Sequence, residues 1–231
     1  MTWEKAITIE RRVPTAAQPS ERVLEVASMF GLGVDESRVQ TVVPRTDLLL
    51  RGGEVIFITG PSGSGKSTIL RGIADQVQGC LRFEDVLHSA DDRPIIEQIG
   101  ETVQEAALIL SLAGLADAFV MLRRPSELSD GQRYRLGLAR LIERATHTDE
   151  LAEIVILADE FGATLDRLTA SVVAHNVRRW VDRSPRVCFI AATTHEDLID
   201  ALVPDVLIYK PLGGGIEIHR RGENASGERG E

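Results

Sequence analysis

The hydrophobic and polar positions of this chain follow two alternating patterns. Short continuous apolar runs, rich in β-branched residues, are typical of the buried strands of a parallel sheet. Longer stretches with apolar residues three and four positions apart are typical of helices that pack on such a sheet. Both patterns occur in turn after residue 54, and they predict an α/β domain.

The predicted strands are residues 6–13, 39–50, 54–59, 154–158, 187–192, 206–209 and 215–219, with 83–87 as a candidate short strand. The turn Arg51-Gly52-Gly53 predicts a hairpin between 39–50 and 54–59. The predicted helices are residues 68–77, 136–144, 169–182 and 198–202, and two more within 102–122 on either side of Gly114. Residues 20–30 fit either a strand or a helix. We expect one domain over residues 1–221 with a helical subdomain at about 94–140, and a disordered tail over the Gly-, Glu- and Ser-rich residues 222–231.

A phosphate-binding motif follows the predicted strand 54–59. The segment Gly60-Pro-Ser-Gly-Ser-Gly-Lys-Ser-Thr68 matches the P-loop, or Walker A, pattern GxxxxGK[ST]. Its glycines let the backbone turn sharply and point N–H groups into one concavity at a helix N-terminus, which suits a phosphate chain. Lys66 can reach the β- and γ-phosphates, and the Ser67 hydroxyl can ligate Mg²⁺. A chance Gly/Ser-rich turn is the alternative, but the strand before and the helix after favour a nucleotide site. The predicted phosphate-binding residues are Gly60, Ser62, Gly63, Ser64, Gly65, Lys66, Ser67 and Thr68.

The apolar run 154–158 ends in two carboxylates, Asp159 and Glu160. In a buried parallel strand, Asp159 at the carboxyl end would hold Mg²⁺ through water, as a Walker B aspartate does. Glu160 would face the γ-phosphate as the base that orients the attacking water. The alternative is a strand that ends in acidic turn residues.

The segment Glu127-Leu-Ser-Asp-Gly-Gln-Arg-Tyr-Arg135 resembles the LSGGQ signature of ABC ATPases, with Asp130 in place of the second glycine. The resemblance implies that Ser129, Gly131 and Gln132 grasp the γ-phosphate of an ATP held by a second subunit. Taken alone, the run could be an ordinary N-capped helix. The carboxylate of Asp130 would repel the γ-phosphate unless its side chain points away. We expect Asp130 to act as an N-terminal cap of the helix; the alternative is an ion pair with an arginine such as Arg133.

Two further segments carry the same resemblance. Residues 161–166 occupy the position of the D-loop, and His195, after the strand 187–192, is similar to the switch histidine that contacts the γ-phosphate. A lone histidine at a strand end could also be a solvated loop residue. Together the motifs span residues 30–209. They imply an ABC-type P-loop NTPase with a mainly parallel sheet, an N-terminal antiparallel β region and a reduced helical signature subdomain, in which Glu160 and His195 are catalytic.

The chain also departs from the ABC pattern. Only about sixty residues separate Thr68 from Ser129, and no strand leading to a Q-loop is legible. Gln98 is the candidate Q-loop residue and metal ligand, with a plain surface glutamine as the alternative. Phe30 is the candidate for the aromatic residue that stacks on adenine, although it could equally belong to the core.

Composition limits the partners. The chain has 26 basic and 35 acidic residues and a net charge of −9, which does not favour nonspecific nucleic-acid binding, although clustered arginines could form a local basic face. Cys80 and Cys188 are too few and too far apart for a metal framework, and they indicate a reducing cytoplasm. No apolar segment approaches the length that spans a bilayer, so we expect a cytoplasmic protein without direct membrane insertion.

A closer resemblance rests on residues 127–135, 158–166 and 192–198. These segments are similar to soluble ABC-type ATPases that are fused to, or encoded beside, a predicted acetyltransferase domain. The resemblance implies an ATPase that closes with ATP and Mg²⁺ as a head-to-tail homodimer and drives or regulates a separate protein, such as an acetyltransferase. The alternatives are the ATP-binding subunit of a membrane transporter and an ATP-gated clamp on nucleic acid or protein.

Overall fold

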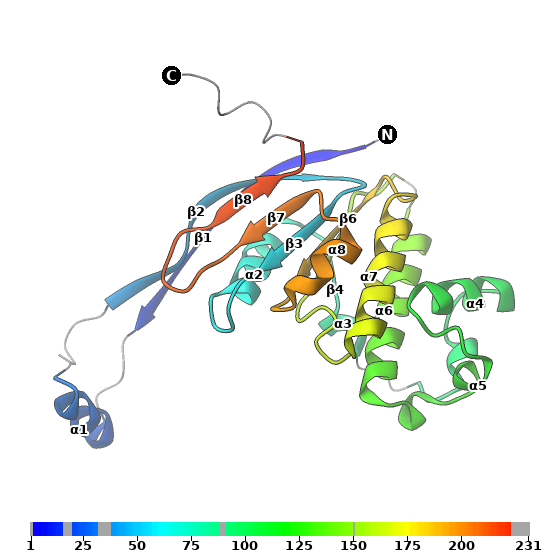
Figure 1. The fold of residues 1–231 in the computed structure, drawn as a ribbon, viewed down its shortest axis with the longest axis horizontal. Helices are drawn as coiled ribbons and strands as arrows, with labels where there is room; N and C mark the ends of the chain where they lie inside the picture. Colours follow the sequence, from blue (N-terminus) through cyan, green and yellow to red (C-terminus); the bar gives the residue numbers. More distant parts are fainter. Residues whose placement is uncertain (1, 16–19, 32–37, 88–90, 150, 223–231) are drawn as a thin grey trace.

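The computed structural model describes residues 2–15, 20–31, 38–87, 91–149 and 151–222 (Figure 1). Residues 223–231 of the predicted tail lie outside the described residues. The strands are β1 (Glu4–Thr15), β2 (Arg38–Arg51), β3 (Val55–Thr59), β4 (Leu81–Arg82), β5 (Ile154–Ala158), β6 (Val187–Ala192), β7 (Val206–Tyr209) and β8 (Glu217–Arg220). The helices are α1 (Glu21–Met29), α2 (Lys66–Gln76), α3 (Glu84–Leu87), α4 (Val103–Leu112), α5 (Ala118–Met121), α6 (Asp130–His147), α7 (Arg167–Val181) and α8 (Ile199–Leu202). Short 3-10 helices lie at Ile95–Glu97, Pro125–Glu127 and Glu196–Leu198.

The central sheet of the described residues has six strands in the order β4-β5-β6-β3-β7-β8. Every neighbouring pair is parallel except β7 and β8, which run antiparallel. The mainly parallel core that the sequence predicts is therefore confirmed. Because parallel strands end at the same edge, the loops that follow β3, β4, β5 and β6 share one edge of this sheet.

Both faces of the central sheet are buried, which explains why its strands are continuous apolar runs rather than alternating ones. In β3, Val55 and Phe57 belong to the core shared with α6 and α7, whereas Ile56 and Ile58 belong to the core shared with α2 and the N-terminal strands. Strands β5 and β6 divide their side chains between the two cores in the same way.

Strands β1 and β2 form a separate antiparallel ribbon, which confirms the predicted N-terminal β region. The ribbon packs on α2, and Figure 1 shows α1 beyond its far end, away from the central sheet. The predicted hairpin between β2 and β3 is wrong. The turn at Gly52 and Gly53 instead passes the chain from the ribbon into the central sheet, where the Gly53 N–H donates to Val187 O at 2.8 Å. The fully buried β3 gains two partners there, β6 and β7, instead of one.

The region between α2 and α6 is short and mostly helical. The predicted strand at 83–87 is wrong, because β4 ends at Arg82 and residues 84–87 form α3. Phe83 and Val86, three positions apart, are both buried in the core with α6. Two helices, α4 and α5, lie on either side of Gly114 as predicted, and residues 20–30 contain a helix. None of the helices within the described ranges combines the length and the apolar character needed to cross a membrane.

Candidate functional site

Several candidate residues converge at the carboxyl edge of the central sheet. The loop 60–65 follows β3, and Asp159 and Glu160 follow β5. His195 follows β6, which lies between those two strands. The strand order therefore brings together motifs that are up to 135 positions apart in the sequence.

The phosphate loop has a backbone shape that requires glycine. Gly60, Gly63 and Gly65 have φ values of 138°, 75° and 106°, which residues with a Cβ rarely adopt. A Cβ on Gly60 would lie 2.1 Å from the carbonyl oxygen of Lys210, and one on Gly65 would lie 2.8 Å from Cγ1 of Val42. Helix α2 begins directly after Gly65 and has no side-chain cap at its N-terminus. Its first N–H groups can therefore bind an anion in the loop.

The polar side chains of the loop fit nucleotide phosphates. The Lys66 ammonium donates to the carbonyl oxygens of Gly60 at 2.8 Å and Pro61 at 3.0 Å, so it is folded back on its own loop. Burial lowers the pKa of Lys66, and the charges of Asp159 and Glu160 oppose this shift. The hydroxyl oxygens of Thr59 and Ser64 are buried, and neither has a hydrogen-bond partner in the described part of the chain. Buried polar atoms are normally paired, and phosphate oxygens bound in the loop would be suitable partners.

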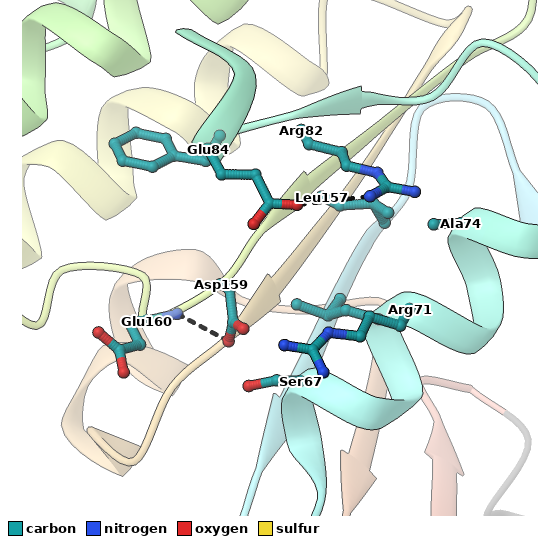
Figure 2. A pocket seen from close by; sticks show the side chains of 10 residues that line it. Ser67, Arg71, Ala74, Arg82, Glu84, Leu157, Asp159 and Glu160 are labelled. Carbon is teal, nitrogen blue, oxygen red and sulfur yellow. Dashed lines mark hydrogen bonds and ion pairs between the residues drawn. The ribbon is translucent and has the colours of Figure 1, made fainter. Parts of the chain in front are cut away.

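A cavity of about 230 Å³ lies beside the loop, between α2 and the ends of β4 and β5. Figure 2 shows the Ser67 hydroxyl and the Asp159 carboxylate on the same side of this cavity, with Glu160 next to them. Glu160 has a φ of 50°, which is uncommon for a residue with a side chain, and its N–H donates to Asp159 Oδ1 at 3.0 Å. The residues that line the cavity are Ser67, Leu70, Arg71, Ala74, Arg82, Phe83, Glu84, Leu157, Asp159 and Glu160.

The segment after Glu160 is fixed to helix α6. The Phe161 N–H donates to Ala192 O at 2.9 Å, and the Gly162 N–H donates to the buried hydroxyl of Tyr134 at 2.9 Å. Burial raises the pKa of Tyr134 well above its usual value, so this hydroxyl stays protonated. The predicted D-loop thus begins at a fixed position relative to the predicted signature helix.

Helix α6 begins with a capping box. The Ser129 hydroxyl accepts from Gln132 N at 3.3 Å, and the Ser129 N–H donates to Gln132 Oε1 at 3.0 Å. The predicted capping role of Asp130 is therefore wrong, because Ser129 is the cap. The alternative arrangement is the observed one: Asp130 is the first helical residue and forms a 2.8 Å ion pair with Arg133. Figure 1 shows that the start of α6 lies apart from the start of α2 in the same chain.

The chain is similar in sequence and in fold to ATP-binding cassette proteins. A family model described as ABC transporter matches residues 44–103. The lipoprotein-releasing system ATP-binding protein LolD of Maricaulis maris is 27% identical over 215 residues, covering 77% of this chain and 90% of LolD. The macrolide export ATP-binding/permease protein MacB of Nitrosomonas europaea is 30% identical, covering 80% of this chain and 32% of MacB. A dimeric post-hydrolysis structure of the ATP-binding cassette MJ0796, bound to ADP and Pi, has a TM-score of 0.61 and 17% identity, covering 93% of this chain and 98% of that one.

The chain is an ABC-class ATPase domain.

Two residues predicted for the site of this ABC ATPase lie elsewhere. The side-chain oxygen of Gln98 accepts from Arg140 at 2.7 Å and its amide donates to Arg93 O, so both ends of the amide are occupied and Gln98 does not line the cavity. Phe30 follows α1 beyond the end of the ribbon, is 74% exposed and does not line the cavity either. Their predicted roles as metal ligand and adenine platform have no support in this arrangement.

The sequence reasoning missed Glu84. Strand β4 pairs with β5 so that Arg82 lies opposite Leu157, and the next residue, Phe83, donates its N–H to Leu157 O at 3.0 Å. Glu84, the first residue of α3, follows directly and lines the same cavity as Asp159, as Figure 2 shows. The available signal was a carboxylate just after a buried phenylalanine, but a strand of two residues is too short to be recognised from its pattern.

Proposed function

We propose that this domain binds MgATP at residues 60–68 and hydrolyses it with Glu160 as the base. The observation that carries the proposal is the convergence of Lys66, Ser67, Asp159 and Glu160 around the phosphate loop and its cavity. An amine, a hydroxyl and two carboxylates at a glycine loop are the groups that phosphoryl transfer to water requires.

Each residue has a separate role in this proposal. Lys66 leaves the carbonyl oxygens of Gly60 and Pro61 and binds the β- and γ-phosphates. Ser67 and Asp159 would hold Mg²⁺, which when bound neutralises charge on the phosphates. Glu160 orients and polarises the attacking water, and His195 contacts the γ-phosphate. The positive φ of Glu160 fits such a role, because strained backbone is concentrated at functional sites.

A second copy of the chain would complete the site. The signature residues Ser129, Gly131 and Gln132 are at the start of α6, which lies apart from the start of α2 in the same chain, so they would contact ATP bound to another copy. The solved relative MJ0796 is dimeric. We therefore propose a head-to-tail homodimer that forms when ATP binds, with each nucleotide held between the loop of one copy and the signature of the other.

The comparisons favour a membrane partner over the predicted acetyltransferase. LolD is named as the ATP-binding protein of a lipoprotein-releasing system, and MacB as an ATP-binding/permease protein. The segments α4 and α5 expose apolar side chains that suit a protein contact: Leu108, Phe119 and Leu122 are 63%, 79% and 67% exposed. We propose that the domain drives a membrane protein from its cytoplasmic side. An acetyltransferase partner and a nucleic-acid clamp stay predictions without support from the comparisons.

Titration with ATP tests the nucleotide site. Lys66→Ala should abolish ATP binding with the fold intact, because the mutation removes the charge that meets the phosphates. Lys5→Ala is the matched control, since Lys5 lies on β1 and does not line the cavity. Micromolar ATP affinity in Lys66→Ala would overturn the assignment.

The partner is tested separately, by recovering Glu160→Gln with ATP from native membranes and comparing it with the same protein carrying Phe119→Ser and Leu122→Ser.

A further inference from the structure

The buried polar side chains of this protein are concentrated around the phosphate loop. Apart from the phenol of Tyr134 and the thiol of Cys188, the buried polar or charged side chains of the described residues are those of Thr59, Ser64, Thr193 and Lys210. Thr59 directly precedes the loop and Ser64 belongs to it. Thr193 follows β6, and Lys210 follows β7. Lys210 is the charged member of this group and is only 2% exposed.

Lys210 lies directly against the phosphate loop. Its backbone N–H donates to Thr59 O at 2.9 Å, and its carbonyl oxygen is the atom that a Cβ on Gly60 would meet. Its Cε lies 4.0 Å from the position that a Cβ on Gly65 would take. The backbone of Lys210 therefore lies against Gly60, and its side chain lies beside Gly65.

The ammonium of Lys210 has no carboxylate partner within the described residues. It donates to the carbonyl oxygens of Pro211 at 2.9 Å and Gly214 at 3.0 Å, both in the turn between β7 and β8. Burial lowers the pKa of this lysine, and no carboxylate opposes the shift. A buried cation that is held by neutral carbonyls alone carries a desolvation penalty, which a polyanion bound nearby would reduce.

The basic residue at position 210 is a lysine, although nearly all basic residues of this chain are arginines. The sequence has 26 basic residues, of which only Lys5, Lys66 and Lys210 are lysines and the other 23 are arginines. A lysine has an unbranched stem and a compact charge, whereas a planar guanidinium needs more room for its five donors. The narrow space beside Gly65 and the turn carbonyls therefore suits lysine.

We propose that Lys210 gives the phosphate site a second, buried positive charge, which favours nucleoside triphosphates over less charged nucleotides. This inference rests on the proposed function. Lys66 and the loop N–H groups bind the phosphates directly. Lys210 lies behind the loop and acts on the phosphates by its charge, without contacting them. Because Coulomb attraction acts over several ångströms, this charge contributes to phosphate affinity without touching the nucleotide.

The test compares Lys210→Met with Lys5→Met in titrations with ATP, ADP and AMP. Methionine keeps the length of the stem and removes the charge, and Lys5→Met makes the same charge change far from the loop. We expect Lys210→Met to bind ATP roughly tenfold more weakly, with a smaller loss for ADP and the smallest for AMP. An equal loss for all three nucleotides would show a purely structural role and overturn the proposal, as would unchanged ATP affinity. Failure of the unmodified protein to bind ATP would instead overturn the proposed function itself.

A second measurement does not depend on how the variant folds. With only three lysines, protein labelled with ¹⁵N at the lysine Nζ gives few side-chain ammonium signals. We expect the Lys210 signal to shift progressively as AMP, ADP and ATP are compared, and the Lys5 signal to stay in place. A Lys210 signal that does not move when ATP shifts the Lys66 signal would overturn the proposal.

Discussion

Replacing Tyr134 with phenylalanine removes one atom that links α6 to the segment that follows Glu160. Tyr134 is buried in α6, and its hydroxyl accepts the Gly162 N–H at 2.9 Å, two residues after Glu160. The ring itself packs at 4.5 Å from Phe83 and 6.5 Å from Phe161, measured between centroids. Phenylalanine keeps these ring contacts. The substitution therefore leaves the Gly162 N–H buried without its partner and changes little else.

The expected loss of folding stability follows from the unpaired Gly162 N–H. Leaving a buried hydrogen-bond donor unsatisfied costs about 1–3 kcal/mol. In a domain of this size, each kcal/mol lowers the melting temperature by roughly 2–4 °C, so we expect a fall of roughly 2–12 °C. Turnover should also fall, because Gly162 helps to hold the backbone that carries Glu160, whereas ATP affinity should change little.

Thermal unfolding and steady-state ATPase assays would measure both effects. Tyr209→Phe is the matched control, because Tyr209 is the other tyrosine of the chain, is only half-buried, and its hydroxyl has no hydrogen bond within the described residues. If Tyr134→Phe unfolded at the same temperature as this control, the bond to Gly162 would contribute nothing and the reasoning would be refuted.

Three further substitutions test the site. Glu160→Gln should reduce ATP hydrolysis by about 10² to 10⁴ and retain ATP binding, since it keeps the shape and removes the base; unaffected turnover would make Glu160 a structural acid. Asp130→Gly, made in the Glu160→Gln background, should tighten the ATP-bound dimer in light scattering, because it removes a carboxylate from the surface that meets the γ-phosphate; a stable dimer without nucleotide would contradict this. Gly60→Ala should abolish ATP binding in titrations, because the new Cβ would collide with Lys210 O at 2.1 Å and φ is 138°.

Local chemistry could be predicted from the sequence because its determinants are contiguous. The phosphate loop needs glycines and a lysine within nine positions, and these specify its backbone shape and its charge without help from the rest of the chain. The start of α6 is similar, since Ser129 and Gln132 are three residues apart and cap the helix between them. The continuous apolar runs of β3, β5 and β6 also predicted strands that are buried on both faces.

Pairing between distant segments was decided only by the tertiary structure. The turn at Gly52 and Gly53 is legible in the sequence, but whether β3 continues a hairpin or enters another sheet depends on which partners bury its two faces. The same reason explains why the place of Glu84 beside Asp159 could not be predicted: β4 has only two residues and is defined by its pairing with β5. Lys210 is the extreme case, because it is 150 positions from Gly60 and nothing in the local sequence indicates that its side chain is buried against the phosphate loop.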